Sequence, residues 1–340
     1  MPPATSVIIV NWNGRVHLAD CLDSLAAQDF RDFEVILVDN GSEDDSVAFV
    51  RRFYPWVRVL ELPTNTGFAG GNNRGLELAR GRYIVTLNND TKVAGDWLTI
   101  LVGVAESHAQ VGMVGCRICV FSEPNRIDSL GLGICSDGMA RGHYRNLYRA
   151  DLALPEVMEI LCPSACAALY RREMLDEIGF FDEDFFAYAE DVDLGLRGRL
   201  AGWPAVLANR ALVYHKYSQS SGSLSPLKVY QVERNHYWVA VKTFPVAQLL
   251  GLPLFTLLRW LVQCRALVRR RGTGAEFYAG SAPLRLVGAQ LRGLLAALGG
   301  IPPNLAKRRG IMAQRRLAPT EFSRLLKEYR IGYRELLDDK

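Results

Sequence analysis

Short apolar runs alternate with helical patterns over the first 115 residues of the chain. The apolar stretch from Ser6 to Val10 is rich in β-branched residues and predicts a strand. Leu18, Leu22 and Leu25 follow it at near-helical spacing, and Val35–Val38 is a second apolar run. This segment therefore predicts a strand, a helix and a second strand.

The same alternation continues as far as residue 115. Three further strands are predicted at Val57–Leu62, Tyr83–Leu87 and Val111–Gly115, and two further helices at Gly70–Arg80 and Trp97–Ser107. Strands that are apolar on both sides and alternate with helices imply a mostly parallel central sheet with helices on both faces. Ligands of such sheets bind beyond the carboxyl ends of the strands, so the polar residues found there are the first candidates for chemistry.

The pattern divides the chain into a catalytic part and a helical extension. Residues 116–215 mix strands with short helices, and the chain after residue 227 is almost wholly helical in pattern. We expect a catalytic domain over residues 1–240, in which residues 5–115 form a nucleotide-binding half and residues 116–240 an acceptor half. Residues 241–340 are then expected to form a basic, amphipathic helical extension.

Charge separates the same two parts. Residues 1–239 hold 22 Lys and Arg against 30 Asp and Glu, whereas residues 240–340 hold 18 against 6. A basic tail favours an anionic surface. Its cations are interleaved with Leu, Val and Trp rather than with polar base-reading residues, so we expect a membrane surface and no nucleic acid.

The most apolar segment, Val246–Val268, is interrupted by Arg259. An Arg near the middle of a membrane span costs roughly 2.5 to 3.5 kcal/mol. Helices that lie in the membrane interface are therefore predicted rather than a span, with a soluble dimerisation module as the alternative. The N-terminus has no signal-peptide pattern, and seven scattered Cys do not suggest a disulfide framework, so a cytoplasmic protein is expected.

Two acids follow predicted strands. Asp39 comes directly after the second strand, where it could accept hydrogen bonds from a nucleobase or a ribose, or simply form an Asx-turn. Asp90 ends the sequence Asn88-Asn89-Asp90 after the fourth strand. One or two carboxylates suffice to hold Mg²⁺ or Mn²⁺ on a diphosphate, so Asp90 is a candidate metal ligand, again with a plain turn as the alternative.

A glycine-rich run, Asn65–Gly75, leads into the helix predicted at Gly70–Arg80. Glycines allow close backbone approach, and a helix start offers free N–H groups to an anion. The run is neither a P-loop nor a GxGxxG motif, which weakens NTPase and dinucleotide dehydrogenase interpretations. Arg74 could add a cationic contact to a nucleotide, although a plain loop has the same composition.

Three further candidates lie in the second half of the catalytic domain. The pair Glu190-Asp191 is flanked by aromatics, where burial can raise a carboxyl pKa and make it a usable base. His215 ends an apolar strand and could be a second metal ligand, and Arg234 could meet a leaving diphosphate. The alternatives are charge compensation at a helix N-terminus, a surface histidine and a solvated helix face.

Taken in order, these motifs resemble those of the family 2 glycosyltransferases, which have the nucleotide-diphospho-sugar transferase fold. The resemblance covers residues 5 to about 240. It rests on the phrases Val-Asn-Trp-Asn, Val-Asp-Asn-Gly-Ser-x-Asp, Asn-x-Gly-Phe-Ala-Gly-Gly-Asn-Asn, Asn-Asn-Asp and Glu-Asp, and on the later His. The sequence departs from the family's DxD pattern because Asn88 replaces the first acid.

The resemblance implies a role for each candidate. It implies that Asp39 binds the base, that Asp90 and His215 hold Mg²⁺ or Mn²⁺, and that Asp191 is the general base. Glu190 is expected to support the general base Asp191 or to contact the acceptor. The remaining expected nucleotide-sugar contacts are Asn11, Asn13, Gly67, Asn72, Asn73, Arg74, Asn89 and Arg234.

The reaction implied is a single in-line displacement with inversion. The glycine-rich run and basic tail look most like the rhamnosyltransferases of cell-envelope polysaccharide synthesis, which implies dTDP-rhamnose as donor and a glycan or polyprenyl-diphosphate-linked acceptor at the inner face of the membrane. One alternative is a catalytically silent nucleotide-sugar-binding scaffold. Another is a nucleotidyltransferase, but Asn11-Trp12-Asn13-Gly14 lacks the phosphate loop that this class needs.

Overall fold

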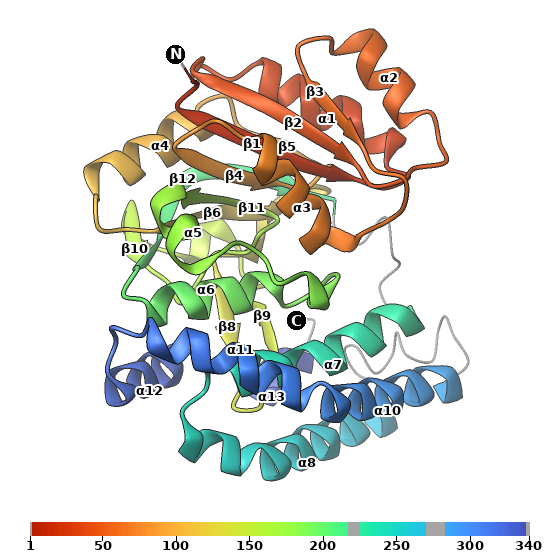
Figure 1. Ribbon diagram of the computed structural model, residues 1–340, viewed down its shortest axis with the longest axis vertical. Helices are drawn as coiled ribbons and strands as arrows, with labels where there is room; N and C mark the ends of the chain where they lie inside the picture. Colours follow the sequence, from red (N-terminus) through yellow and green to blue (C-terminus); the bar gives the residue numbers. More distant parts are fainter. Residues whose placement is uncertain (1, 217–224, 270–282, 338–340) are drawn as a thin grey trace.

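The computed structural model describes residues 2–216, 225–269 and 283–337. These residues form a mixed α/β structure around one large sheet, with helices gathered at the C-terminal end (Figure 1). The strands of the described residues are β1 (Thr5–Asn11), β2 (Phe33–Asp39), β3 (Arg58–Glu61), β4 (Tyr83–Leu87), β5 (Thr91–Val93), β6 (Met113–Val120), β7 (Glu123–Ser129), β8 (Leu132–Ile134), β9 (Ala140–Gly142), β10 (Val157–Glu159), β11 (Ala167–Arg171) and β12 (Ala205–His215).

The sheet runs in the order β10-β12-β6-β11-β4-β1-β2-β3, with β5 paired to β12 and β7 to β6. The strands β1 to β4 pair in parallel, as do β6 and β12. This confirms the expected mostly parallel sheet. The strand predicted at 111–115 does not lie next to β4, because the later strand β11 inserts antiparallel between β4 and β6.

Helices cover both faces of the sheet. Their bounds are α1 (Arg15–Ala26), α2 (Ser46–Phe53), α3 (Gly67–Leu78), α4 (Trp97–Ser107), α5 (Arg172–Ile178), α6 (Glu190–Leu200), α7 (Pro226–Thr243), α8 (Val246–Arg269), α10 (Pro283–Gly299), α11 (Ile301–Ala313), α12 (Pro319–Glu328) and α13 (Tyr333–Leu337), with short 3₁₀ turns η1 (Arg149–Asp151) and η2 (Glu183–Phe185). Leucines of α1 and Trp97 of α4 pack on one face. Ala69 of α3 and Met174 of α5 pack on the other.

A third apolar cluster joins the C-terminal helices to the sheet domain. Phe185 of η2 and Leu196 of α6 pack with Val239 of α7 and Phe322 of α12. The boundary expected near residue 240 falls inside α7, which begins at Pro226 and ends at Thr243. Because α7 also packs against α10 and α11, it connects the helical end of the molecule to the sheet domain (Figure 1).

Candidate active site

Polar side chains from three strand ends meet at one edge of the sheet. Asn11 and Asp39 are paired across β1 and β2, and the Asn11 amide donates to the Asp39 carboxylate at 3.1 Å. The side-chain amide of Asn89, after β4, donates to the side-chain oxygen Oδ1 of Asn11 at 2.8 Å. All three residues were expected from the sequence because parallel strands present their carboxyl ends at the same edge.

The loops after β1 and β2 are tied together. The backbone N–H of Asn13 donates to the Ser42 hydroxyl at 2.9 Å, and the Asn13 side chain accepts from the Glu43 N–H at 2.8 Å. Asp39 also accepts from the Ser42 N–H at 3.0 Å. The turn and the strand-end carboxylate therefore occur together, so the two interpretations of Asp39 do not compete.

The glycine-rich run begins α3 at Gly67 rather than at Gly70. Asn40 fixes this start, because its amide nitrogen donates to the Gly67 carbonyl and its oxygen accepts from the Thr66 N–H, each at 2.9 Å. Gly67 has φ +77°, and a Cβ there would overlap the carbonyl of Phe186. The loop before α6 therefore packs directly against the start of α3.

The expected contacts on α3 have partners within the protein. Asn72 is buried and its amide donates to the Phe68 carbonyl at 2.9 Å. Asn73 donates to the Phe181 carbonyl at 2.9 Å and accepts from the Phe181 N–H at 3.2 Å. Arg74 is exposed and pairs with Glu77 at 2.5 Å. Asn73 thus holds α3 to the segment that leads toward α6.

Asp90 and His215 face each other at the centre of this edge. Their Oδ1 and Nε2 atoms are 3.4 Å apart, and both side chains are buried. His215 Nδ1 lies 2.9 Å from Asp128, which is itself paired with Arg145 at 3.0 Å. Burial alone would raise the pKa of Asp90, but the hydrogen bond and the charge of His215 outweigh it and lower that pKa.

This donor set fits a divalent metal ion. A carboxylate on Nδ1 orients a histidine so that Nε2 is available to a metal. Among the described residues, no group of three or more His, Cys, Asp or Glu side chains is placed to hold a metal. Two protein ligands suit Mg²⁺ or Mn²⁺, because the phosphates of a substrate and water complete the coordination.

The acid pair lies at the N-terminus of α6. The two oxygens of Asp191 accept from the N–H groups of Ala165 and Val192, at 3.2 and 2.9 Å. Burial raises the pKa of Asp191, although these N–H groups oppose the shift. Burial, and then the charge of Asp191, raise the pKa of Glu190 well above its usual value, and Glu190 Oε2 has no hydrogen-bond partner among the described residues.

Two adjacent residues join the acid pair to the metal candidates. The N–H of Ala165 donates to Asp191, and the carbonyl of Cys166 accepts from the Asn88 N–H at 2.8 Å. Asn88 is two residues from Asp90 and starts the turn that follows β4. Asp191 and the turn that holds Asp90 are therefore both hydrogen-bonded to the segment that enters β11.

The loop before the acid pair has an unusual backbone. Phe186, Tyr188 and Ala189 have φ values of 64°, 70° and 67°, a region in which residues other than glycine are strained. Asn235 of α7 donates to the carbonyls of Phe185, Ala187 and Tyr188 at 3.0, 2.9 and 2.7 Å. The two N–H groups of one buried amide are thus shared among three carbonyls and hold the loop in this conformation.

Arg234 supports the same loop. Its guanidinium donates to the carbonyls of Asp184 and Phe185 at 2.9 and 3.0 Å, and it lies over the Trp238 ring at 4.3 Å. The sequence suggested that Arg234 meets a diphosphate. In this structure it binds backbone carbonyls of the loop that leads to Glu190 and Asp191. We call this part of the site the acid side.

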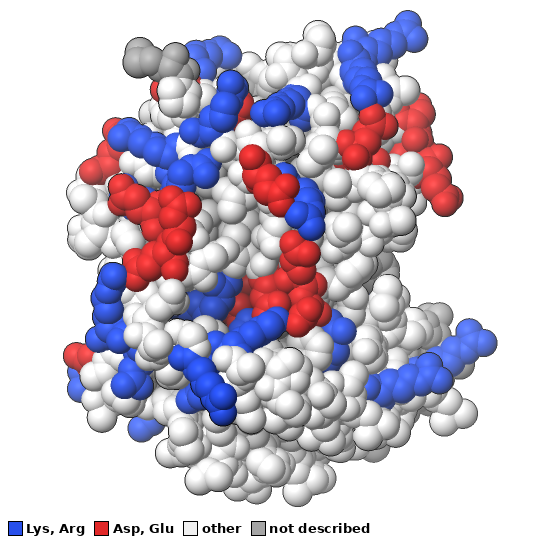
Figure 2. All heavy atoms as spheres, in the orientation of Figure 1, with Lys and Arg blue, Asp and Glu red and all other residues white. Residues whose placement is uncertain are grey.

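Ion pairs continue from the acid pair into the C-terminal helices. Lys242 of α7 lies 2.7 Å from Asp182 and 2.7 Å from Asp193, and Lys307 of α11 pairs with Asp182 and Asp184. Figure 2 shows acidic side chains bordered by basic ones across the middle of this face. The helical end thus fixes the acid side of the site through charge as well as through apolar packing.

Sequence reasoning did not identify Asp128 or Asn235. Asp128 lies on β7, in the region whose pattern was too irregular to assign, and its position beside His215 depends on the pairing of β6 with both β7 and β12. Asn235 follows Arg234 in the middle of α7 and has no local feature that indicates a partner 50 residues away.

The fold and the polar strand ends are those of an α/β protein of the kind that binds ligands beyond the carboxyl ends of its strands. The model of glycosyl transferase family 2 matches residues 6–179, a little over half of the chain. The chain therefore belongs to this family and is a glycosyltransferase, as the resemblance implied. A relative from Mycobacterium tuberculosis, N-acetylglucosaminyl-diphospho-decaprenol L-rhamnosyltransferase, is 28% identical over 65% of this chain and 79% of its own.

Solved structures share the fold at low sequence identity. TarS 1–349 from S. aureus has a TM-score of 0.54 at 17% identity, over 97% of this chain and 91% of that one. The mannosyltransferase PcManGT from Pyrobaculum calidifontis, solved with GDP-Man and Mn²⁺, has a TM-score of 0.54 at 18% identity, over 92% and 86%. The likeness to TarS extends to nearly the whole chain, so it includes the C-terminal helices.

Proposed function

We propose that the protein is an inverting glycosyltransferase that moves a sugar from a nucleotide diphosphate to an acceptor hydroxyl, with Asp191 as the general base. The observation that carries this proposal is the short link between Asp191 and the Asp90 turn through Ala165 and Cys166. It links a half-buried carboxylate with a raised pKa to the turn at the strand ends, where a nucleotide would bind.

Each side of the site has a distinct part in the reaction. Asp39 accepts hydrogen bonds from the base or ribose. The start of α3 was expected to bind the diphosphate, but its Gly67 and Ala69 N–H groups already donate to Asn65 and Phe186. Asp90 and His215 would hold Mg²⁺ or Mn²⁺, and PcManGT was solved with Mn²⁺. The ion, when bound, neutralises charge on the departing diphosphate.

The acid side supplies proton transfer and position. Asp191 removes the proton of the acceptor hydroxyl as that oxygen attacks the anomeric carbon, and the bond to the nucleotide diphosphate breaks on the opposite face. Burial favours this role, because it raises the pKa of Asp191 toward the working range of a base. Glu190 lies beside it, where it supports Asp191 or contacts the acceptor.

The favoured substrates are dTDP-rhamnose and a glycan or polyprenyl-diphosphate-linked acceptor of the cell envelope. Support comes from the name of the M. tuberculosis relative, which transfers L-rhamnose to a lipid-linked sugar. A lipid-linked acceptor implies that the protein works at the inner face of the cytoplasmic membrane, as a peripheral protein.

The test is transfer by the full chain from a panel of nucleotide sugars, with and without Mn²⁺, and with the anomeric configuration of the product determined by NMR. We expect inversion, and we expect Asp191→Asn to abolish transfer while nucleotide diphosphate binding remains. Asp96→Asn, an exposed acid with no hydrogen bond to the start of α4, is the control and should stay active.

Other outcomes would select a different function. Retention of configuration, or full turnover by Asp191→Asn, would contradict the proposed mechanism. Nucleotide binding without turnover of any donor would favour a silent scaffold. Pyrophosphate release from a nucleoside triphosphate and a sugar phosphate would favour a nucleotidyltransferase.

A further inference from the structure

Helix α8 turns Thr256 and Arg259 inward and several leucines outward. Arg259, in the middle of this helix, is fully buried and binds Asp137 at 2.6 Å and Glu233 at 2.8 Å. The opposite face of the helix exposes leucines, including Leu250 at 81% and Leu254 and Leu261 at 58%. A soluble monomer gains nothing from such a face, so it indicates a contact beyond the chain.

Helix α10 extends the same kind of surface. Leu284, Leu291 and Leu295 recur on one side of it and are 85%, 49% and 67% exposed. Arg285 and Arg292 are exposed beside that stripe, and Arg265 is exposed near the end of α8. Neither α8 nor α10 contains an Asp or Glu. In Figure 2 this end of the molecule is largely uncharged, with basic side chains at its margins.

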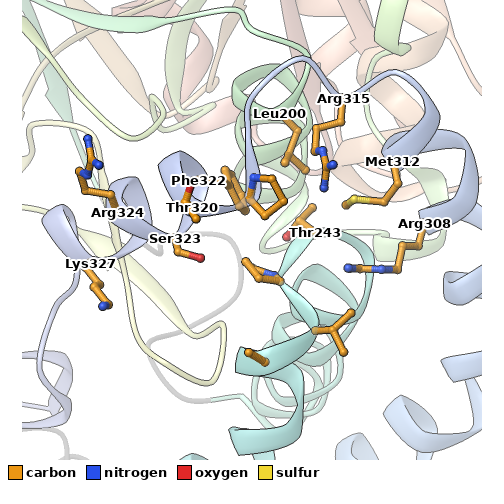
Figure 3. Close-up of a pocket in the computed structure, with 14 residues that line it drawn as sticks. Leu200, Thr243, Arg308, Met312, Arg315, Thr320, Phe322, Ser323, Arg324 and Lys327 are labelled. Carbon is orange, nitrogen blue, oxygen red and sulfur yellow. The ribbon is translucent and has the colours of Figure 1, made fainter.

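A pocket of about 670 Å³ opens at the start of α8, where Val246 and Ala247 line it. Four cations line the same pocket, and no Asp or Glu does: these are Arg308, Arg315, Arg324 and Lys327. Figure 3 shows Arg308 and Arg315 extending toward Thr243 in the middle of the pocket, while Arg324 and Lys327 lie on the α12 side.

The cations of the pocket lack counter-charges. Arg308 donates to the Val241 carbonyl at 3.0 Å. None of the four cations forms an ion pair with any residue that the structure describes. Burial, and then the charge of Arg315, lower the pKa of Arg308. Like charges gathered without an acid are stabilised by a bound anion.

We propose that the exposed leucines of α8 and α10 form a docking face for an anionic lipid bilayer, and that the pocket holds a lipid phosphate at the edge of that face. The leucines insert among acyl chains, while the arginines beside them contact headgroups. This inference rests on the proposed function, since a lipid-linked acceptor is reached from a membrane surface.

The geometry favours a helix that lies on the membrane over one that crosses it. Val246–Ala266 is long and apolar enough to span, and only 11% of its most apolar window is buried. Crossing would remove Arg259 from Asp137 and Glu233 and leave two buried carboxylates without their cation. The helix can instead keep these ion pairs and present its leucines to lipid.

Charge also argues against a second copy of the chain as the partner. A two-fold dimer places the same patch on both sides of the interface. Such an interface would gather Arg265, Arg285 and Arg292 of both copies, with no acid on either α8 or α10. An anionic bilayer is complementary to this surface in both charge and apolarity.

The experiment is flotation of the full chain with phosphatidylcholine vesicles, with or without phosphatidylglycerol as the anionic lipid. We expect binding only with phosphatidylglycerol. Arg308→Gln/Arg315→Gln should weaken it by about thirtyfold, since each of the two cations near an anionic surface contributes on the order of 1 kcal/mol. Leu250→Ser/Leu254→Ser should weaken it by a similar factor or more, because two leucines that insert among the acyl chains are lost.

Matched controls lie at the opposite end of the molecule. Arg52→Gln/Arg58→Gln removes two exposed cations on α2 and β3, and Phe53→Ser removes an exposed apolar side chain. Both control variants should leave flotation unchanged. Each variant is also assayed for donor turnover with a soluble acceptor, which docking variants should retain. Loss of flotation with normal turnover therefore separates docking from the proposed function.

Four outcomes would overturn the proposal. The first is equal flotation by the docking variants and the wild type, and the second is equal binding to neutral vesicles. The third is that millimolar inorganic phosphate binds the protein without lipid and abolishes its binding to vesicles. The fourth is that the wild type forms a stable dimer which the leucine variants lose. The third would mean that the pocket takes free phosphate. The fourth would assign the leucine face to a second copy of the chain.

Discussion

The two sides of the active site are built in different ways. On the strand-end side, Asn11, Asp39 and Asn89 meet because parallel strands end at a common edge, and their contacts link adjacent strands. On the acid side, Glu190 and Asp191 follow a loop with three non-glycine residues at positive φ. That loop is held by Asn235, from a helix almost 50 residues further along the chain.

The difference shows where each kind of precision originates. The strand-end side inherits its geometry from the sheet, so its residues need only suitable chemistry. The acid side depends on tertiary contacts that overcome backbone strain, with Gly67 against Phe186 on one side and Asn235 on the other. We therefore expect substitutions on the acid side to affect turnover, and substitutions at the strand ends to affect binding.

The largest effect is expected from Asp191→Asn. An amide of the same shape cannot accept the acceptor proton, so transfer should fall by about 10³-fold or more, near the upper range for loss of a general base. Nucleotide diphosphate affinity, measured by calorimetry, should stay within about twofold. Comparable losses of affinity and turnover would mean that the two sides do not divide the work as proposed.

The same carboxylate sets the acid limb of the pH profile in the wild type. Burial raises the pKa of Asp191, so the base becomes protonated at a higher pH than an exposed Asp, whose pKa is about 3.9. Transfer should therefore be lost as pH falls through this raised pKa. The kcat profile measured at saturating donor and metal checks this, and an acid limb at the exposed-Asp value would contradict it.

Asn235→Ala should lower kcat by about 10²-fold, since small misplacement of a catalytic group has effects of that order. The donor KM should change little, because Asn235 contacts the acid-side loop. A looser loop exposes Asp191 to water, so the acid limb of the pH profile should move to lower pH.

The matched control for this prediction is Asn304→Ala. Asn304 is also a buried helical asparagine, and its amide donates to the Gly300 carbonyl at 2.8 Å, away from the site. It should lose stability in thermal unfolding without a comparable loss of kcat. Equal kcat losses in the two variants would assign Asn235 a merely structural role.

This contrast also explains how much the sequence could predict. The strands β1, β2 and β4 and the position of Asp39 and Asp90 at their ends follow from local apolar runs and the residues after them. The antiparallel insertion of β11 and the placement of Asp128 beside His215 depend on long-range pairing. The inward polar face of α8 could not be predicted either, because Arg259 finds its partners on Asp137 and Glu233 far along the chain.

Asp128→Asn tests the strand-end side through its metal candidates. Loss of the Asp128 carboxylate charge beside Nδ1 should leave the His215 ring less firmly oriented. The affinity for Mn²⁺ should then fall by about 10- to 100-fold. Calorimetric titration of Mn²⁺ in the presence of a nucleoside diphosphate measures this. Asp176→Asn, an exposed acid on α5, is the control. Unchanged Mn²⁺ affinity in Asp128→Asn would remove His215 from the metal site.

Asp39→Asn is expected to give the smallest effect. The amide oxygen can still accept from the Ser42 N–H, so the turn should persist, but the charge offered to a base or ribose is lost. A hydrogen bond to a charged group contributes about 1.5 to 3 kcal/mol, so dTDP, UDP or GDP should bind roughly tenfold more weakly or worse, with kcat at saturating donor nearly unchanged. Asp32→Asn, an exposed acid before β2, should bind normally. A fall in kcat without a change in nucleotide affinity would place Asp39 with the acid side and end the division of the site on which these predictions rest.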